Sequence, residues 1–195
     1  MQALDRLSFE PDELAYLALT SKPEHLVRDR LAWALTKDGH HVAREWRRCD
    51  LAVLDGDDPA AILELKAAHT ARVEWGLASG GSQRAAFAER HGGRTYFEGL
   101  IRADAAKALV SARPEGEAYV AVVLYHVADP VPRQLDAFVK YGVELRRVAD
   151  RRQSERKVGE YLVRLGETTK VRLGAGTAFG IRCGVDVWLC GPVKG

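Results

Sequence analysis

Two carboxylates and one lysine are the side chains whose types and spacing best suit catalysis in this sequence. Glu64 and Lys66 alternate within Ile62-Leu63-Glu64-Leu65-Lys66, so an extended strand would place both on one face. Asp50 opens the preceding apolar segment, and a hairpin through the Asp-rich stretch 55–59 would bring it beside Glu64. The sequence therefore predicts an acidic pair with a neighbouring amine on two adjacent strands.

Such an acidic pair is suited to binding a divalent cation. Two nearby carboxylates repel each other, and a cation relieves that repulsion. Mg²⁺ prefers hard oxygen ligands, and Mn²⁺ would be able to substitute. Asp50 and Glu64 would supply two ligands and the backbone carbonyl of Leu65 a third, with phosphate oxygen and water completing the shell. Lys66 would hold the attacking water or stabilise the transition state, which is what phosphodiester hydrolysis requires.

The elements that must position these residues follow from the periodicity of apolar side chains. Helices are expected at 11–19, 23–37, 82–91, 97–110 and through most of 133–165. Strands are expected at 41–47, 49–54, 61–67 and 118–127, with one or two more within 169–189. Alternating helices and strands predict an α/β (α+β) fold, in which a mixed central sheet is flanked by helices.

Length and composition set further limits. A chain of 195 residues, 47% hydrophobic and 29% charged, excludes a disordered tail and a coiled coil. No apolar run is long enough for a spanning helix, and the start of the chain lacks a signal peptide, so a cytoplasmic location without a membrane partner is expected. The net charge of +2 points to no particular partner. Cys49, Cys183 and Cys190 form no C-x-x-C pair, which favours reduced, buried thiols over a zinc site.

The order of motifs resembles the PD-(D/E)XK, or restriction-endonuclease-like, nuclease superfamily. The match consists of a helix, a strand that begins with Asp50, a hairpin to the strand bearing Glu64-Leu65-Lys66, and then a helix and a strand. Cys49 stands where the name-giving Pro would be. Glu24 lies on the helix before the first core strand, where many members carry a Glu. The resemblance covers roughly residues 20–127 and leaves about 128–195 as C-terminal helix and strand additions to a single domain, 1–195.

The resemblance implies an αβββαβ core and a metal-dependent nuclease acting on DNA. It makes Asp50 and Glu64 metal ligands, Lys66 catalytic, and Glu24 an accessory ligand or water-binding group. A lone catalytic domain of this size usually needs a second copy to cut both strands, so the resemblance also implies a homodimer or a partner subunit. Four further residues are candidates for contact with the substrate: Arg48, His69, Gln83 and Arg84.

Other interpretations of these residues remain open from the sequence alone. Ser21-x-x-Glu24 fits a capping box, and Glu64 and Lys66 fit the solvated face of a half-exposed strand. The arginine-rich stretch 146–157 fits phosphate binding and a helix laced with ion pairs equally well. The corresponding functions are a non-catalytic DNA-binding or assembly module of a defence or repair complex, an RNase, or an enzyme acting on modified nucleotides.

Overall fold

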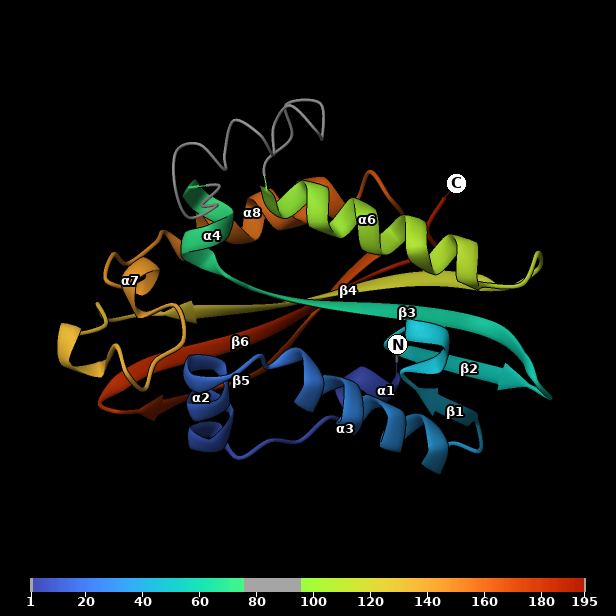
Figure 1. Ribbon diagram of the computed structural model, residues 1–195, viewed down its shortest axis with the longest axis horizontal. Coiled ribbons are helices and arrows are strands. Elements are labelled where there is room, and N and C mark those ends of the chain that lie inside the picture. Colours follow the sequence, from blue (N-terminus) through green and yellow to red (C-terminus); the bar gives the residue numbers. More distant parts are fainter. Residues whose placement is uncertain (1, 76–95, 195) are drawn as a thin grey trace.

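Six strands form one mixed β-sheet through the middle of the protein, in the order β1-β2-β3-β4-β6-β5 (Figure 1). The structure is a computed structural model that describes residues 2–75 and 96–194. The strands are β1 (His41–Arg44), β2 (Leu51–Asp55), β3 (Asp58–His69), β4 (Glu117–Val127), β5 (Thr168–Ala178) and β6 (Ile181–Cys190). The first three form an antiparallel meander, β4 is parallel to β3, and β6 and β5 follow in antiparallel pairing.

Helices cover both faces of this sheet (Figure 1). Those below it in the view are α1 (Gln2–Asp5), α2 (Pro11–Thr20) and α3 (Glu24–Lys37). Those above it are α4 (Thr70–Trp75), α6 (Tyr96–Ser111) and α8 (Arg151–Leu162), and α7 (Gly142–Leu145) lies beyond one end. The predicted class, a mixed sheet flanked by helices, is confirmed. None of the helices in the described part of the chain combines the length and apolar composition that crossing a membrane requires.

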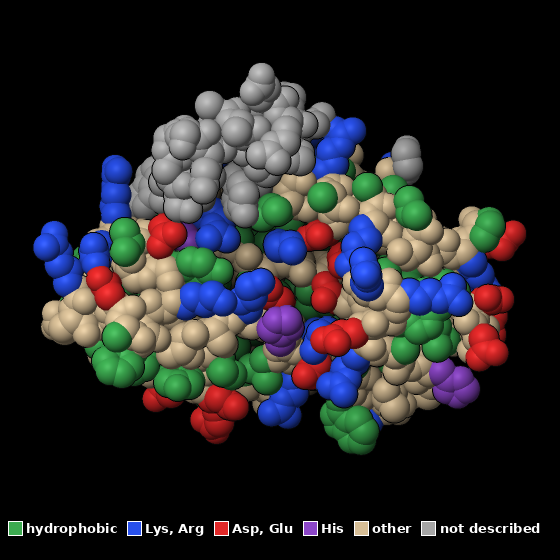
Figure 2. All heavy atoms as spheres, viewed as in Figure 1, with side chains coloured by type: hydrophobic (Ala, Val, Ile, Leu, Met, Phe, Trp, Pro, Cys, Tyr) green, Lys and Arg blue, Asp and Glu red, His purple; other side chains and the backbone are tan. Residues whose placement is uncertain are grey.

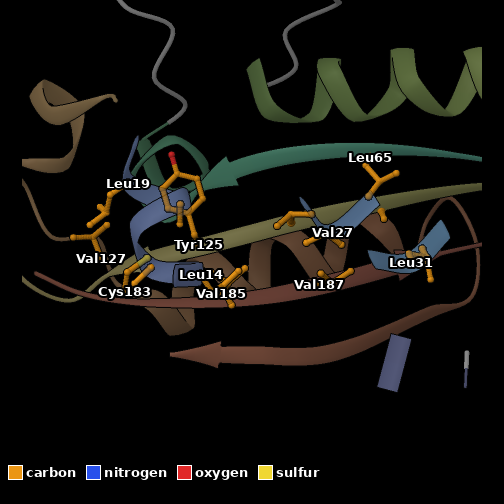
Figure 3. Packing of buried hydrophobic residues seen from close by; sticks show 14 of the residues in the cluster. Leu14, Leu19, Val27, Leu31, Leu65, Tyr125, Val127, Cys183, Val185 and Val187 are labelled. Carbon is orange, nitrogen blue, oxygen red and sulfur yellow. The ribbon is translucent and has the colours of Figure 1, made fainter. Parts of the chain in front are cut away.

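Side chains on the two faces of the sheet build two separate apolar clusters. On the α1–α3 side, helix residues such as Leu14 and Val27 pack against Leu65, Val185 and Val187 (Figure 3). On the other side, α6 and α8 pack on the opposite face of the same strands, as the buried residues Ile62, Val120, Val122, Ile101 and Val158 illustrate. Because β4 is buried on both faces, its continuous apolar sequence is explained.

Helix α2 lies close against the far end of β5. A Cβ added at Gly176 would lie 2.1 Å from the carbonyl oxygen of Pro11, so only glycine permits this approach. The backbone amide of Thr177 donates a hydrogen bond to the Asp12 carboxylate at 2.8 Å. These two contacts fix α2 to β5, although the two elements lie at opposite ends of the sequence.

Several expected boundaries were wrong. Stretch 133–165 is interrupted, because Tyr141 adopts a left-handed φ of 64° and only α7 and α8 are α-helical within it. A short 3-10 turn, Arg133–Leu135, precedes them. The strand expected at 41–47 ends at Arg44 and is followed by a 3-10 turn, Trp46–Arg48. The helix expected at 82–91 falls outside the described residues.

The capping box that the sequence left open as one interpretation of Ser21 and Glu24 does not form at the start of α3. Pro23 occupies the N-cap position, and no side chain caps it. The Ser21 hydroxyl instead donates backward to the Leu17 carbonyl at the end of α2. Glu24 is therefore not engaged in capping the helix that it begins.

Candidate functional site

The candidate site lies where β3 continues past the start of β2. Leu51 is the first β2 residue paired with β3, opposite Leu63, so β3 has no β2 partner from Glu64 onward. Asp50 stands at this fork, and its Oδ2 accepts a hydrogen bond from the Leu65 amide at 2.8 Å. Because the amide and carbonyl of one strand residue point to the same side, the Leu65 carbonyl also faces the free edge of β3. The hairpin thus brings Asp50 beside the Glu-Leu-Lys segment.

The loop at 45–48, just before Asp50, has an unfavourable backbone conformation. Glu45, Arg47 and Arg48 all have positive φ, between 47° and 72°. Such angles cost a non-glycine residue about 1–2 kcal/mol. The Glu45 amide donates to the Asp50 carbonyl, and the Glu45 carboxylate accepts from Arg28 at 2.8 Å. Strain of this kind persists where surrounding contacts impose it, and it clusters at functional sites.

Glu64 is a buried carboxylate with one basic partner in the described structure. Its side chain is on the α6 face of β3, where Lys107 Nζ lies 2.8 Å from Oε2. The residue is 2% exposed, and Oε1 has no hydrogen-bond partner. Burial raises the pKa of Glu64 above its ordinary value of 4.5; the Lys107 hydrogen bond offsets this in part, and the Asp50 charge adds to it. Asp50 and Glu64 are therefore electrostatically coupled.

Lys66 points to the same helix. Its Nζ lies 3.2 Å from Asp104 Oδ2 on α6, three residues before Lys107. Burial raises the pKa of Asp104, with the Lys66 charge opposing that shift. Figure 2 shows acidic and basic side chains gathered in a band between the α6 layer and the α3 layer. The site therefore contains two residues, Asp104 and Lys107, that the sequence reasoning missed.

These side chains supply the donor types that Mg²⁺ prefers but do not form a complete protein cage. Within residues 2–75 and 96–194, no group of three or more His, Cys, Asp or Glu side chains is placed to hold a metal ion. Mg²⁺ is commonly bound by one or two carboxylates together with water and substrate phosphate. The coupled Asp50–Glu64 pair, with the unpartnered Glu64 Oε1, fits that kind of site. Lys107 supplies the positive charge beside Glu64 in the metal-free chain.

Glu24 shares a cavity with Lys66 but not with Asp50 and Glu64. Glu24 and Lys66 both line a cavity of about 340 Å³ at the free edge of β3, to which Asp50 and Glu64 do not contribute. Glu24 is 7% exposed, and the nearest basic group in the described structure is Lys22, with Nζ 3.8 Å from Oε1. His69 lines the same cavity, and burial lowers its pKa to about 3, so its ring is neutral.

The remaining candidates have varied positions. Arg48 is exposed in the strained turn before Asp50, whereas Gln83 and Arg84 fall outside the described residues. The arginine-rich stretch is crossed by ion pairs: Arg146 with Asp136, Arg151 with Glu155 and Asp186, and Arg156 with Glu160. These contacts favour the ion-paired interpretation. All three cysteines are buried and free, as expected.

The Asp50 hydrogen bond gives a prediction about folding that is separate from activity. Asp50→Ala leaves the Leu65 amide without its acceptor and is expected to cost about 1–2 kcal/mol of unfolding free energy. Asp50→Asn keeps an oxygen acceptor and is expected to lose much less. Urea unfolding of the two variants beside wild type measures the difference. Equal stability of the alanine and asparagine variants would contradict a role for this contact.

Comparison of the chain with protein-family models, with curated proteins and with solved structures gave no match.

Proposed function

We propose that this protein is a metal-dependent nuclease that hydrolyses phosphodiester bonds of DNA at the β2–β3 fork. The observation that carries the proposal is the meeting of Asp50, Glu64 and Lys66 at that fork. Two carboxylates and an amine at one strand end suit a phosphate and a cation together, because a bound cation relieves the repulsion between the half-buried Asp50 and the buried Glu64.

The order and pairing of the elements agree with the resemblance noted in the sequence. Helix α3 precedes the antiparallel β1-β2-β3 meander, and the chain then passes through α4 and α6 to β4, which is parallel to β3. Apart from the short helix α4, this order is compatible with the αβββαβ core that the resemblance implies. The pattern supports the assignment, although fold alone does not establish an activity.

Each residue has a definable part in this reaction. Asp50 and Glu64, with the Leu65 carbonyl, would hold Mg²⁺; when bound, the ion acidifies water and screens charge on the phosphate. Lys66 would orient the attacking water or donate to the phosphate oxygens. Asp104 holds the Lys66 ammonium in place through its ion pair on α6. Lys107 balances the charge of Glu64 when no metal is bound.

The test is cleavage of supercoiled and linear DNA by the purified protein in Mg²⁺, Mn²⁺ or EDTA, beside Asp50→Ala. We expect cutting in either metal, none in EDTA, and loss of cutting in the variant. RNA of the same sequence, included as a second substrate, separates a DNase from an RNase. Metal-independent cutting, or cutting retained by Asp50→Ala, would overturn the assignment.

The second candidate function is a non-catalytic DNA-binding or assembly module. The observation in its favour is that Lys107 Nζ lies 2.8 Å from Glu64 Oε2, which gives the Glu64 carboxylate a cationic partner without a metal ion. Calorimetric titration distinguishes the two. Saturable Mg²⁺ or Mn²⁺ binding that Glu64→Gln abolishes supports the nuclease, and the absence of such binding supports the module.

A further inference from the structure

The cavity beside Lys66 contains three buried polar groups without hydrogen-bond partners. It opens at the free edge of β3, between Glu24 on α3 and Leu100 on α6. Glu24 Oε2, His69 Nε2 and the Tyr125 hydroxyl are each buried and unpartnered. His69 and Tyr125 are 1% exposed. Leaving such groups unpaired is costly, so three of them around one cavity point to a polar ligand.

The hydrogen-bonding character of each group can be assigned. The Arg72 amide donates to His69 Nδ1 at 3.1 Å, so this nitrogen is the acceptor and Nε2 carries the proton. His69 Nε2 is therefore a donor, and Glu24 Oε2 is an acceptor. The Tyr125 hydroxyl is able to do either, and Figure 3 shows it turned away from the labelled aliphatic side chains. The ligand must thus present a donor and an acceptor within a small space.

Part of the wall of the cavity is aromatic. The His69 ring lies 5.7 Å from Tyr125 and 5.5 Å from Tyr141, measured between ring centroids. The Arg72 guanidinium lies over the other aromatic partner, 4.8 Å from the Tyr141 centroid. Rings and guanidinium planes of this kind pack against planar heterocycles. The volume of about 340 Å³ is within the range of small-molecule sites.

We propose that this cavity binds a nucleobase that carries an exocyclic amino group. Glu24 accepts from the amino group, His69 donates to a ring nitrogen or carbonyl, and Lys66 at the same cavity contacts the attached phosphate. Thymine and uracil have no amino group. Their two carbonyl oxygens flank the ring N–H and would be repelled by the Glu24 carboxylate, so these bases should bind less tightly. The identification of the ligand as a nucleotide rests on the proposed function, and it makes this cavity the pocket for a base next to the cleaved bond.

The test is equilibrium binding of dAMP, dCMP, dGMP and dTMP in EDTA, where no cleavage occurs. We expect the best amino-bearing nucleotide to bind about tenfold more tightly than dTMP, which corresponds to one charge-assisted hydrogen bond. Glu24→Gln should remove most of that preference. Tyr125→Phe should weaken binding without lowering the melting temperature, because the hydroxyl has no protein partner to lose. Glu160→Gln on α8 and Tyr119→Phe are the matched controls and should bind as wild type.

The outcomes separate this inference from the nuclease assignment. A preference that Glu24→Gln removes supports the pocket, whether or not the protein cuts DNA. Equal binding of all four nucleotides, or no saturable binding of any, overturns the pocket even if cleavage is observed. A preference that survives Glu24→Gln in a protein with the wild-type melting temperature also overturns it.

Discussion

Lys66→Ala is expected to reduce DNA cleavage about a thousandfold, the scale seen when a group that stabilises transition-state charge is removed. The ammonium stands at the junction of the Asp50–Glu64 pair and the cavity, 3.2 Å from Asp104. Alanine removes that charge and leaves both carboxylates in place. Rates from single-turnover cleavage in Mg²⁺ measure the loss.

The affinity of Lys66→Ala for DNA should be only slightly lower than that of wild type, since one cationic contact among several is removed. Binding measured in EDTA checks this expectation. Lys37→Ala, at the far end of α3, is a matched control that removes an exposed lysine and should cut normally. Cleavage by Lys66→Ala at the wild-type rate would show that Lys66 has no part in the reaction.

Glu64→Gln is expected to abolish metal-dependent cleavage and yet stabilise the metal-free protein by about 1 kcal/mol at neutral pH. Burial keeps the pKa of Glu64 above 4.5 even with Lys107 beside it, so the ionised form is disfavoured by the fold. Glutamine has nearly the same shape without that charge. Urea unfolding in EDTA beside cleavage in Mg²⁺ measures both effects.

The gain in stability should depend on pH in a defined direction. A carboxyl whose pKa is higher in the folded than in the unfolded state binds its proton more tightly when folded, so it loses stability as pH rises. The difference between Glu64→Gln and wild type should therefore be widest above the raised pKa of Glu64. It should close as pH falls toward 4.5. A gap that widens toward acid would contradict this account.

Lys107→Met is the complementary control for the Glu64–Lys107 ion pair, because it removes the basic partner and keeps the carboxylate. It leaves the Glu64 charge buried without the ammonium and should destabilise the metal-free protein by about 2 kcal/mol, less than for a fully buried pair because Lys107 is partly exposed. Adding Glu64→Gln to this variant should recover most of the loss. Failure of that rescue would mean that the loss in Lys107→Met does not come from the unpaired Glu64 charge.

The parts of the fold that local pattern determines were predictable. The alternation around Glu64 and Lys66 correctly placed both side chains on one face of β3, since each reaches α6. The apolar run at 118–127 was correctly assigned to a buried strand. Period-2 and continuous apolar patterns specify burial directly, so these predictions needed no knowledge of distant contacts.

The missed residues depend on tertiary geometry. Asp104 and Lys107 lie on a helix that was predicted from the sequence, but the register of α6 over β3 decides that they meet Lys66 and Glu64. Polar residues bordering an apolar face, spaced three apart with opposite charges, were the available signal. The helix predicted through most of 133–165 was wrong for another reason. The chain turns at the left-handed residue Tyr141, and the adjacent Gly142 is by itself too weak a signal to place a helix boundary.

The contact between α2 and β5 also limits how the protein meets copies of itself. An outer strand with unpaired backbone groups is a template on which another chain is able to add. At β5, the Thr177 amide already donates its hydrogen bond to Asp12, and the Pro11 carbonyl lies against Gly176. Further along the same strand are two charged residues, Lys170 and Arg172. At the opposite edge, β1 is only four residues long. Both outer strands thus oppose strand addition, so pairing of a second copy along β1 or β5 is disfavoured.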